Sequence, residues 1–187
     1  MAVREIILYG NPRLREKSQP VEELTPELRL LVADMGETMY ATDGVGLAAP
    51  QVGELVRVVV IDVDQVDGRD SRSSRRNLQV FYNPEIIASS DEDELFNEGC
   101  LSFPDIRGDV YRPIRIRFRA RDANFQPFER DADDLLARAM QHEIDHLDGV
   151  FFIDRMSRIK RMALTTKLAA LRRRGLAQAR PEAVALA

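Results

Sequence analysis

The spacing of apolar residues predicts a first helix near the N-terminus. Thr25 is a typical N-cap, and Pro26 suits the first turn of a helix because proline lacks the N–H that this turn leaves unbonded. Apolar side chains then recur at helical spacing, at Leu28, Leu31, Val32, Met35 and Met39. We expect this helix to end at about Thr38 or Tyr40.

Later segments carry the patterns of β-strands. Residues 56–63 form a β-branched run typical of a buried strand, and residues 80–88 have a similar composition, interrupted by Asn83-Pro84. Between residues 114 and 121 apolar residues alternate strictly with arginines, which predicts one buried and one basic face. We interpret the basic face as solvated. A surface that binds nucleic acid usually has aromatic residues among its basic ones, and this face has none. Asn124 then occupies a turn position that accepts a positive φ.

Two segments should be irregular. Residues 42–53 contain three glycines and a proline, a composition typical of a backbone that bends sharply or closely approaches another group. We expect neither a helix nor a regular strand there. Residues 64–77 are almost wholly polar and predict an exposed loop.

Two further helices follow in the second half of the chain. Acidic residues from Asp131 to Asp134 predict the start of a helix that ends just before Gly149. Its apolar side chains place it at the buried centre of the fold. A third helix, at about Ser157 to Arg173, is amphipathic and basic.

Composition is that of a folded chain. With 187 residues, 44% of them apolar, the chain can bury one core and is too short for two ordinary domains, so we expect a single domain over residues 1–187. The apolar run at its start is cut by Gly10-Asn11-Pro12, which predicts neither a signal peptide nor a spanning helix. The single cysteine, Cys100, excludes an internal disulfide and suits a reducing compartment. We therefore expect a cytoplasmic protein without membrane or DNA partners.

Charge is distributed unevenly. Residues 155–187 contain nine basic residues and one acid, so this segment has a net charge of +8 and residues 1–154 a net charge of −12. The basic segment has two interpretations. It is either a solvated helix that faces the acidic body or a surface that docks on ribosomal RNA.

The segment His142-Glu143-Ile144-Asp145-His146 predicts a catalytic metal centre. On a helix, residues four apart share a face, so both imidazoles can bind one ion while Glu143 lies beside a bound water molecule. Two ordinary histidines are the alternative. However, these are the only histidines in the chain, and they flank a glutamate on a helix that should be buried.

A catalytic site of this kind needs a third protein ligand. The longer metalloprotease pattern would place a histidine at position 152, where the chain has Phe152. After Asp154 no carboxylate occurs until Glu182, so the third ligand must come from upstream. The choice lies between a carboxylate and Cys100, and we favour Cys100 because a thiolate suits a borderline-soft ion.

Three segments together closely resemble the motifs of peptide deformylases. They are Gly44-Val45-Gly46-Leu47-Ala48-Ala49-Pro50-Gln51, Glu98-Gly99-Cys100-Leu101-Ser102 and Gln141-His142-Glu143-Ile144-Asp145-His146-Leu147-Asp148-Gly149. The similarity covers most of residues 5–160. It implies an α+β fold, with antiparallel sheets around a central metal-binding helix, an N-terminal helix and a C-terminal helix. Asp134 departs from the family, which commonly has glycine there.

The resemblance also implies a function for the whole chain as one catalytic domain. Family members remove the formyl group from the N-terminal formylmethionine of new proteins and release formate. Their ion, bound by the equivalents of Cys100, His142 and His146, is typically Fe(II) in the cell, and zinc, nickel or cobalt can replace it. Glu143 would act as the acid and base, and the side chain of Gln51 and the backbone N–H of Leu101 would stabilise an oxyanion.

The remaining candidates are substrate contacts. By the same resemblance, Gly46 offers its backbone to the peptide, and Val45, Leu135 and Ala139 are candidates for the methionine pocket. Leu135 and Ala139 could equally belong to the core. We leave open whether Arg138 contacts the substrate or solvent.

Two other functions remain as alternatives. One is a metallopeptidase that cleaves internal peptide bonds, and the lack of a downstream ligand argues against it. The other is a binding protein with a structural metal, which would need a fourth protein ligand.

Overall fold

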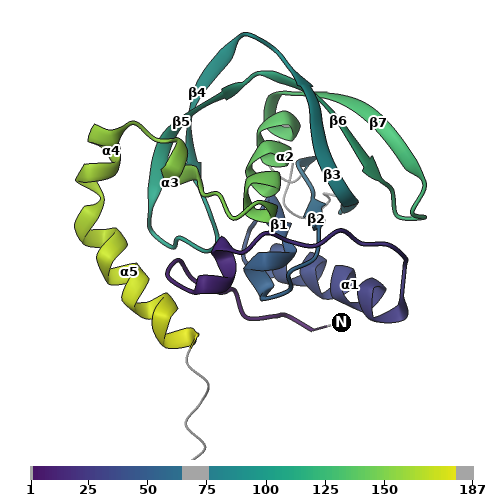
Figure 1. Cartoon of the computed structure of the whole chain (residues 1–187), viewed down its shortest axis with the longest axis horizontal. Helices are drawn as coiled ribbons and strands as arrows, with labels where there is room; N and C mark the ends of the chain where they lie inside the picture. Colours follow the sequence, from purple (N-terminus) through teal and green to yellow (C-terminus); the bar gives the residue numbers. More distant parts are fainter. Residues whose placement is uncertain (1, 65–75, 180–187) are drawn as a thin grey trace, which may run out of the picture.

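The helix that carries both histidines lies between two antiparallel sheets (Figure 1). The computed structural model describes residues 2–64 and 76–179. The central helix, α2, spans Asp134–Leu147 and is followed by Gly149, whose φ of 71° lies in the left-handed region that favours glycine. The predicted second helix and its end are therefore confirmed.

Within residues 2–64 and 76–179, seven strands form two sheets. The larger sheet has the order β1-β2-β3-β6-β7, and β4 pairs with β5 in the smaller one. Every pairing is antiparallel. The strands are β1 Gly46–Ala48, β2 Val58–Ile61, β3 Gln79–Ser89, β4 Asp93–Gly99, β5 Arg107–Pro113, β6 Arg115–Arg121 and β7 Pro127–Asp133. Together with the helices, they confirm the expected α+β class.

Helices cover the sheets from several sides. The N-terminal helix α1, Pro26–Ala41, begins after Thr25, whose side chain accepts a hydrogen bond from the N–H of Leu28. After α2 come α3 Phe152–Arg155, α4 Arg158–Ala163 and α5 Thr165–Gln178. Short 3₁₀ turns occupy Pro12–Arg15 and Ala49–Val52. In the described ranges 2–64 and 76–179, no helix combines the length and apolar character needed to cross a membrane.

Strand β6, which lies in the alternating segment 114–121, has the buried and exposed faces that the pattern predicts. Ile116, Phe118 and Ala120 of β6 are buried, whereas the arginines between them are exposed. These arginines form ion pairs with acidic residues, for example Arg119 with Glu85 at 2.7 Å. The basic face is thus a solvated surface neutralised by the neighbouring strands.

Several local predictions are wrong. Residues 42–53 contain the short strand β1 and a 3₁₀ turn, because Gly46 pairs with Ile61 of β2. The basic third helix is two helices, α4 and α5, with a break at Leu164. The residue with positive φ in the turn after β6 is Phe125, not Asn124.

Two other strand predictions also need correction. Strand β3 continues through Asn83-Pro84 by means of a bulge between Tyr82 and Glu85. The acidic residues before α2 belong largely to β7, which leads directly into the helix. Most of the predicted loop 64–77 lies outside the described residues.

The C-terminal helix packs against the start of the chain. Leu168 and Leu171 of α5 are buried beside residues 7–9, and Gln178 accepts a hydrogen bond of 2.8 Å from the N–H of Leu8. In turn, the N–H groups of Ile7 and Tyr9 donate to the carbonyls of Gln51 and Ser102 at 2.9 Å. The N-terminal segment therefore connects α5 to the two loops that precede the histidine motif in sequence.

Candidate metal centre and active site

Cys100 and the two histidines converge on one point. His142 and His146 lie one turn apart on α2, with ring centroids 5.1 Å apart. Cys100 follows the last residue of β4, and its Sγ lies 3.2 Å from Nε2 of His146. One donor atom from each of the three residues lies within 4.8 Å of the other two. The structure thus brings together the three ligands predicted from sequence.

This donor set fits a divalent transition metal. Two imidazoles and a thiolate suit a borderline-soft ion such as Fe²⁺ or Zn²⁺, and three protein ligands leave a coordination position for water. Burial, reinforced by the nearby charges of His142 and Arg112, holds the pKa of His146 well below its usual range. The neutral ring is the form that binds metal.

Glu98 fixes the ring of His142. Its Oε2 lies 3.0 Å from Nδ1 of His142. Burial would raise the pKa of Glu98, but hydrogen bonds from His142 and Arg112 outweigh it and hold this pKa well below its usual range. Because an ionised carboxylate can only accept, Nδ1 carries the proton, and in the neutral ring Nε2 is the nitrogen that can bind a metal.

Contacts with neighbouring groups also raise the pKa of His142. Burial would lower its pKa, but contacts with Cys100 and Glu98 outweigh that effect and raise the pKa well above its usual value. Metal binding requires the neutral ring and the thiolate, so it releases protons.

Glu143 is an unpaired buried carboxyl group beside the candidate metal ligands. Its side chain is almost fully buried, and its Oε2 has no hydrogen-bond partner among the described residues. Burial raises the pKa of Glu143 to about 7. A carboxyl group with this pKa can both accept and donate a proton near neutral pH.

Gln51 faces the candidate metal ligands from the 3₁₀ turn after β1. Its Oε1 accepts a hydrogen bond of 2.9 Å from the N–H of Ala48, which sets the orientation of the amide. Its Nε2 consequently lies 3.5 Å from Sγ of Cys100 and 3.4 Å from the hydroxyl of Ser102. The glycine- and proline-rich segment therefore holds an amide N–H donor beside the candidate metal ligands.

A cavity of about 560 Å³ opens in front of these groups. Gly46 and Leu101 line it, together with the three residues that the sequence suggested for an apolar pocket, Val45, Leu135 and Ala139. Ala139 also belongs to a cluster of buried apolar side chains, so it both lines the cavity and packs in the hydrophobic core. Cys100, His142, Glu143 and Gln51 also line this cavity.

Other lining residues were not predicted. Phe96 and Arg107 border the cavity, and Phe96 lies two positions before Glu98 on β4. Because residues two apart in a strand share a face, this alternation could have identified Phe96. Arg138, left open by the sequence, is buried, and its Nη1 lies 2.8 Å from Oε1 of Glu98.

Known proteins resemble this chain in sequence and in fold. Residues 3–162 match the family described as Polypeptide deformylase. A peptide deformylase of Rhodopseudomonas palustris strain BisB5 is 46% identical over 176 residues, which cover 94% of this chain and 98% of that protein. One from Bradyrhizobium sp. strain BTAi1 is 48% identical over 161 residues, covering 86% and 91%.

The chain belongs to the polypeptide deformylase family. Solved structures agree. A peptide deformylase from Legionella pneumophila superposes with a TM-score of 0.81 at 39% identity, covering 96% of this chain and 100% of that one. A plant peptide deformylase has a TM-score of 0.85 at 37% identity, covering 94% and 92%. Membership makes this chain a metal-dependent hydrolase that removes the N-terminal formyl group from nascent peptides.

Proposed function

We propose that Cys100, His142 and His146 hold one divalent metal ion at which this chain hydrolyses the formyl group of N-formylmethionyl peptides. The observation that carries the proposal is the convergence of their donor atoms within 4.8 Å, beside the unpaired carboxyl group of Glu143. Among the described residues three candidate ligands converge, rather than four, which argues for a catalytic over a structural metal.

Glu143 is the proposed acid and base. A bound ion would polarise the formyl carbonyl and lower the pKa of a water molecule. Glu143 accepts a proton from the attacking water as its oxygen bonds to the formyl carbon. It then donates this proton to the amine as the carbon–nitrogen bond breaks, which releases formate and the peptide.

Gln51 and Leu101 are the proposed oxyanion donors. When the carbonyl oxygen gains charge, the Nε2 of Gln51 and the backbone N–H of Leu101 donate to it. The hydrogen bond from Ala48 holds the Gln51 amide in the required orientation before the substrate arrives. Donors arranged in advance typically contribute about 3 kcal/mol each to transition-state stability.

The substrate would bind along the same cavity. Val45, Leu135 and Ala139 supply apolar surface for the methionine side chain, and Gly46 presents its backbone to the peptide. A side chain at Gly46 would take the space that the peptide and Glu143 need.

Substitution of two of the proposed ligands tests the site. Cys100→Ser and His146→Ala should each abolish hydrolysis of formyl-Met-Ala and reduce bound metal to well below one ion per chain. The exposed residue Glu129 provides a control, because Glu129→Gln should keep full activity and metal content. Unchanged metal content in the ligand variants would contradict the proposed centre.

Substrate choice separates the alternatives. The purified chain should hydrolyse formyl-Met-Ala and leave an internally quenched peptide intact. Cleavage of the quenched peptide alone would favour a metallopeptidase. Unchanged activity in Glu143→Ala would remove the proposed acid and base.

Fe(II) is the ion that we propose for the cell, with zinc, nickel or cobalt as substitutes, and the cytoplasm is the proposed location. Two imidazoles and a thiolate accept all of these ions, so the donor set alone does not select one. Metal analysis after anaerobic purification, paired with activity, decides the point. Zinc as the main metal in the most active preparation would contradict the assignment to iron.

We also propose that the basic C-terminal helices contact the ribosome, where the substrate emerges. Tyr9 and four arginines, Arg158, Arg161, Arg172 and Arg173, line a groove along α4 and α5 that also contains exposed apolar side chains. Such a basic surface is complementary to the phosphates of ribosomal RNA.

Charge reversal is a better test than truncation, because α5 packs against the N-terminal segment. Arg158→Glu combined with Arg173→Glu should weaken ribosome binding and reduce its salt dependence, while hydrolysis of formyl-Met-Ala stays unchanged. Charge reversal of the exposed strand residues Arg117 and Arg119 is the matched control. Equal binding by both double variants would refute docking through α4 and α5.

A further inference from the structure

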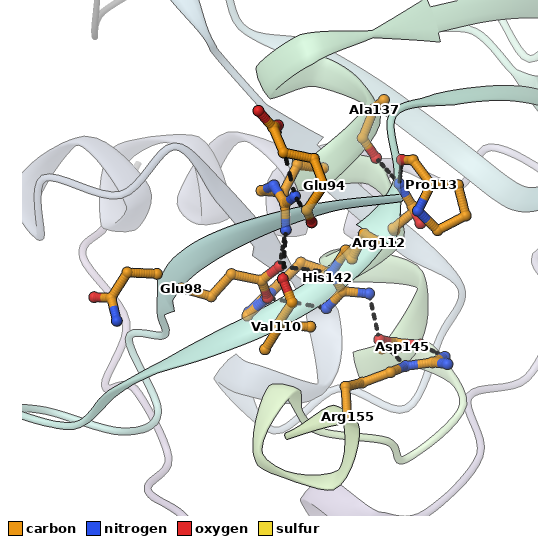
Figure 2. A network of polar contacts seen from close by, with 12 residues as sticks. Glu94, Glu98, Val110, Arg112, Pro113, Ala137, His142, Asp145 and Arg155 are labelled. Atoms are coloured by element: carbon orange, nitrogen blue, oxygen red, sulfur yellow. Dashed lines mark hydrogen bonds and ion pairs between the residues drawn. The ribbon is translucent and has the colours of Figure 1, made fainter. Parts of the chain in front are cut away.

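We propose that Arg155 and Asp145 are positioning residues that hold the metal ligand His142 through Arg112 and Glu98. The inference deepens the proposed function, on which it rests, because it assigns an outer support to one proposed ligand. Figure 2 shows the contacts as a continuous chain from α3 to the central helix.

Each link of the chain is a short polar contact. At the outer end, the Nε and Nη2 atoms of Arg155 donate to the two carboxylate oxygens of Asp145, at 3.1 and 2.5 Å. Asp145 also accepts a hydrogen bond of 2.8 Å from Nη1 of Arg112. Arg112 then donates from Nε and Nη2 to both oxygens of Glu98, at 2.6 and 3.0 Å.

Glu98 joins this chain to the metal site. Besides Arg112, it contacts Nη1 of Arg138 at 2.8 Å and Nδ1 of His142 at 3.0 Å. Each of its oxygens therefore has two partners, which leaves the carboxylate little freedom to rotate. The ring of His142 follows the carboxylate, since that contact sets which nitrogen faces the metal.

Burial makes the arrangement rigid and sensitive. Glu98 and Arg112 are 4% and 3% exposed, and Arg138 and Asp145 are also buried. In such surroundings a buried charge that loses its partner is strongly destabilised, so each group holds the next in place. Arg155 is the exception, because its side chain is 48% exposed.

Arg155 is therefore the outer end of this series of contacts. Its fork of two N–H groups fixes both oxygens of Asp145, and Asp145 fixes the side of the Arg112 guanidinium that faces away from Glu98. Without Arg155, Asp145 would keep its single bond to Arg112 and could turn toward water. The rotation of Arg112, and hence the position of Glu98, would then be less defined.

Metal retention and metal spectroscopy test the inference. Loss of a direct outer-sphere partner typically weakens metal affinity by about 10- to 100-fold. For Arg155, which is four contacts from His142, we expect a smaller loss of about 3- to 10-fold in Arg155→Met. Zn²⁺ affinity is measured by chelator competition, and the visible absorption of the Co²⁺-loaded protein reports ligand geometry.

Matched variants separate positioning from general destabilisation. Arg117→Met removes an exposed arginine of β6 outside this network and should leave both the Zn²⁺ affinity and the Co²⁺ spectrum unchanged. Arg155→Lys, which keeps the charge but not the fork, should give an intermediate affinity. In steady-state kinetics with formyl-Met-Ala, Arg155→Met should lower kcat more than it raises KM.

A double variant tests the route. If Arg155 acts through Glu98, Arg155→Met should cause no further loss of Zn²⁺ affinity in a Glu98→Gln background. Should Glu98→Gln fold too poorly to measure, Asp145→Asn provides the same comparison. A full additional loss in the double variant, or equal behaviour of Arg155→Met and Arg117→Met, overturns the inference.

One more variant distinguishes a failure of the proposed metal centre from a failure of the positioning role. His142→Ala should lose Zn²⁺ affinity far more than Arg155→Met. If His142→Ala keeps wild-type affinity, the proposed metal centre fails. If it loses affinity while Arg155→Met does not, only the positioning role fails.

Discussion

Gly46 of β1 lies against Glu143 so closely that a Cβ added to Gly46 would be 2.6 Å from Oε1 of Glu143. That distance is too short for a carbon–oxygen contact, so any side chain at Gly46 must displace the carboxyl group. The contact gives a chemical reason for the glycine in a segment whose pairing with Ile61 would accept other residues.

We therefore expect Gly46→Ala to lower kcat/KM for formyl-Met-Ala by about 100-fold, because a misplacement of about 1 Å can cost that much. Metal content should stay near that of the unsubstituted chain, since the clash is with Glu143 and not with a ligand. Activity is measured at matched metal content. Wild-type kcat/KM in Gly46→Ala would show that Glu143 can move without loss.

Glu143 should carry a cost in stability. Burial raises its pKa from an ordinary 4.5 to about 7, so the metal-free chain loses stability as pH rises through this interval, and the full loss is present above pH 7. Glu143→Gln should abolish activity and yet raise the free energy of unfolding of the metal-free protein by about 1–3 kcal/mol at pH 8.

Denaturant unfolding at pH 4 and pH 8 checks this prediction. The gain from Glu143→Gln should be small at pH 4, where the carboxyl group is protonated in both states, and large at pH 8. The exposed Glu129→Gln should change stability by less than about 0.5 kcal/mol at either pH. A gain for Glu143→Gln that does not depend on pH would contradict the effect of burial.

Hydrolysis should depend on the ionisation of the same group. In the proposed mechanism the carboxylate accepts the proton of water, so activity should fall as pH drops below the pKa of Glu143. A bound cation favours the carboxylate and lowers this pKa, so the acid limb of kcat/KM should lie below about 7 and above the ordinary value for glutamate. A pH–rate profile with formyl-Met-Ala measures the limb, and its midpoint should rise when a weaker Lewis acid replaces the native ion.

Asp134 begins α2 with a φ of 46°, a left-handed conformation that costs a residue with a side chain more than it costs glycine. Asp134→Gly should therefore stabilise the chain by about 0.5–1 kcal/mol, which raises Tm by a few degrees. Asp133→Gly, at a φ of −133°, should lower Tm and is the matched control. Lower Tm in Asp134→Gly would show that the carboxylate contributes more than the backbone strain costs.

Local pattern was sufficient for much of the fold. The strict alternation of residues 114–121 predicted β6 and its buried face, and Thr25-Pro26 predicted the start of α1, because both signals depend on residues close in sequence. Patterns failed where long-range pairing decides the outcome. Gly46–Ala48 became a strand only because β2 lies beside it, and the break at Leu164 separates two helices that share one amphipathic pattern.

The candidate metal centre was also predictable from the sequence only in part. By itself, the sequence determined that two histidines share a helix face with a glutamate between them, because helical geometry fixes that spacing, and by exclusion it pointed to Cys100. Only the tertiary structure placed Cys100 beside His146 and connected Glu98 to Arg155 through Arg112 and Asp145. Those contacts join four separate elements, and their partners are selected by packing and burial of charge, which no local pattern records.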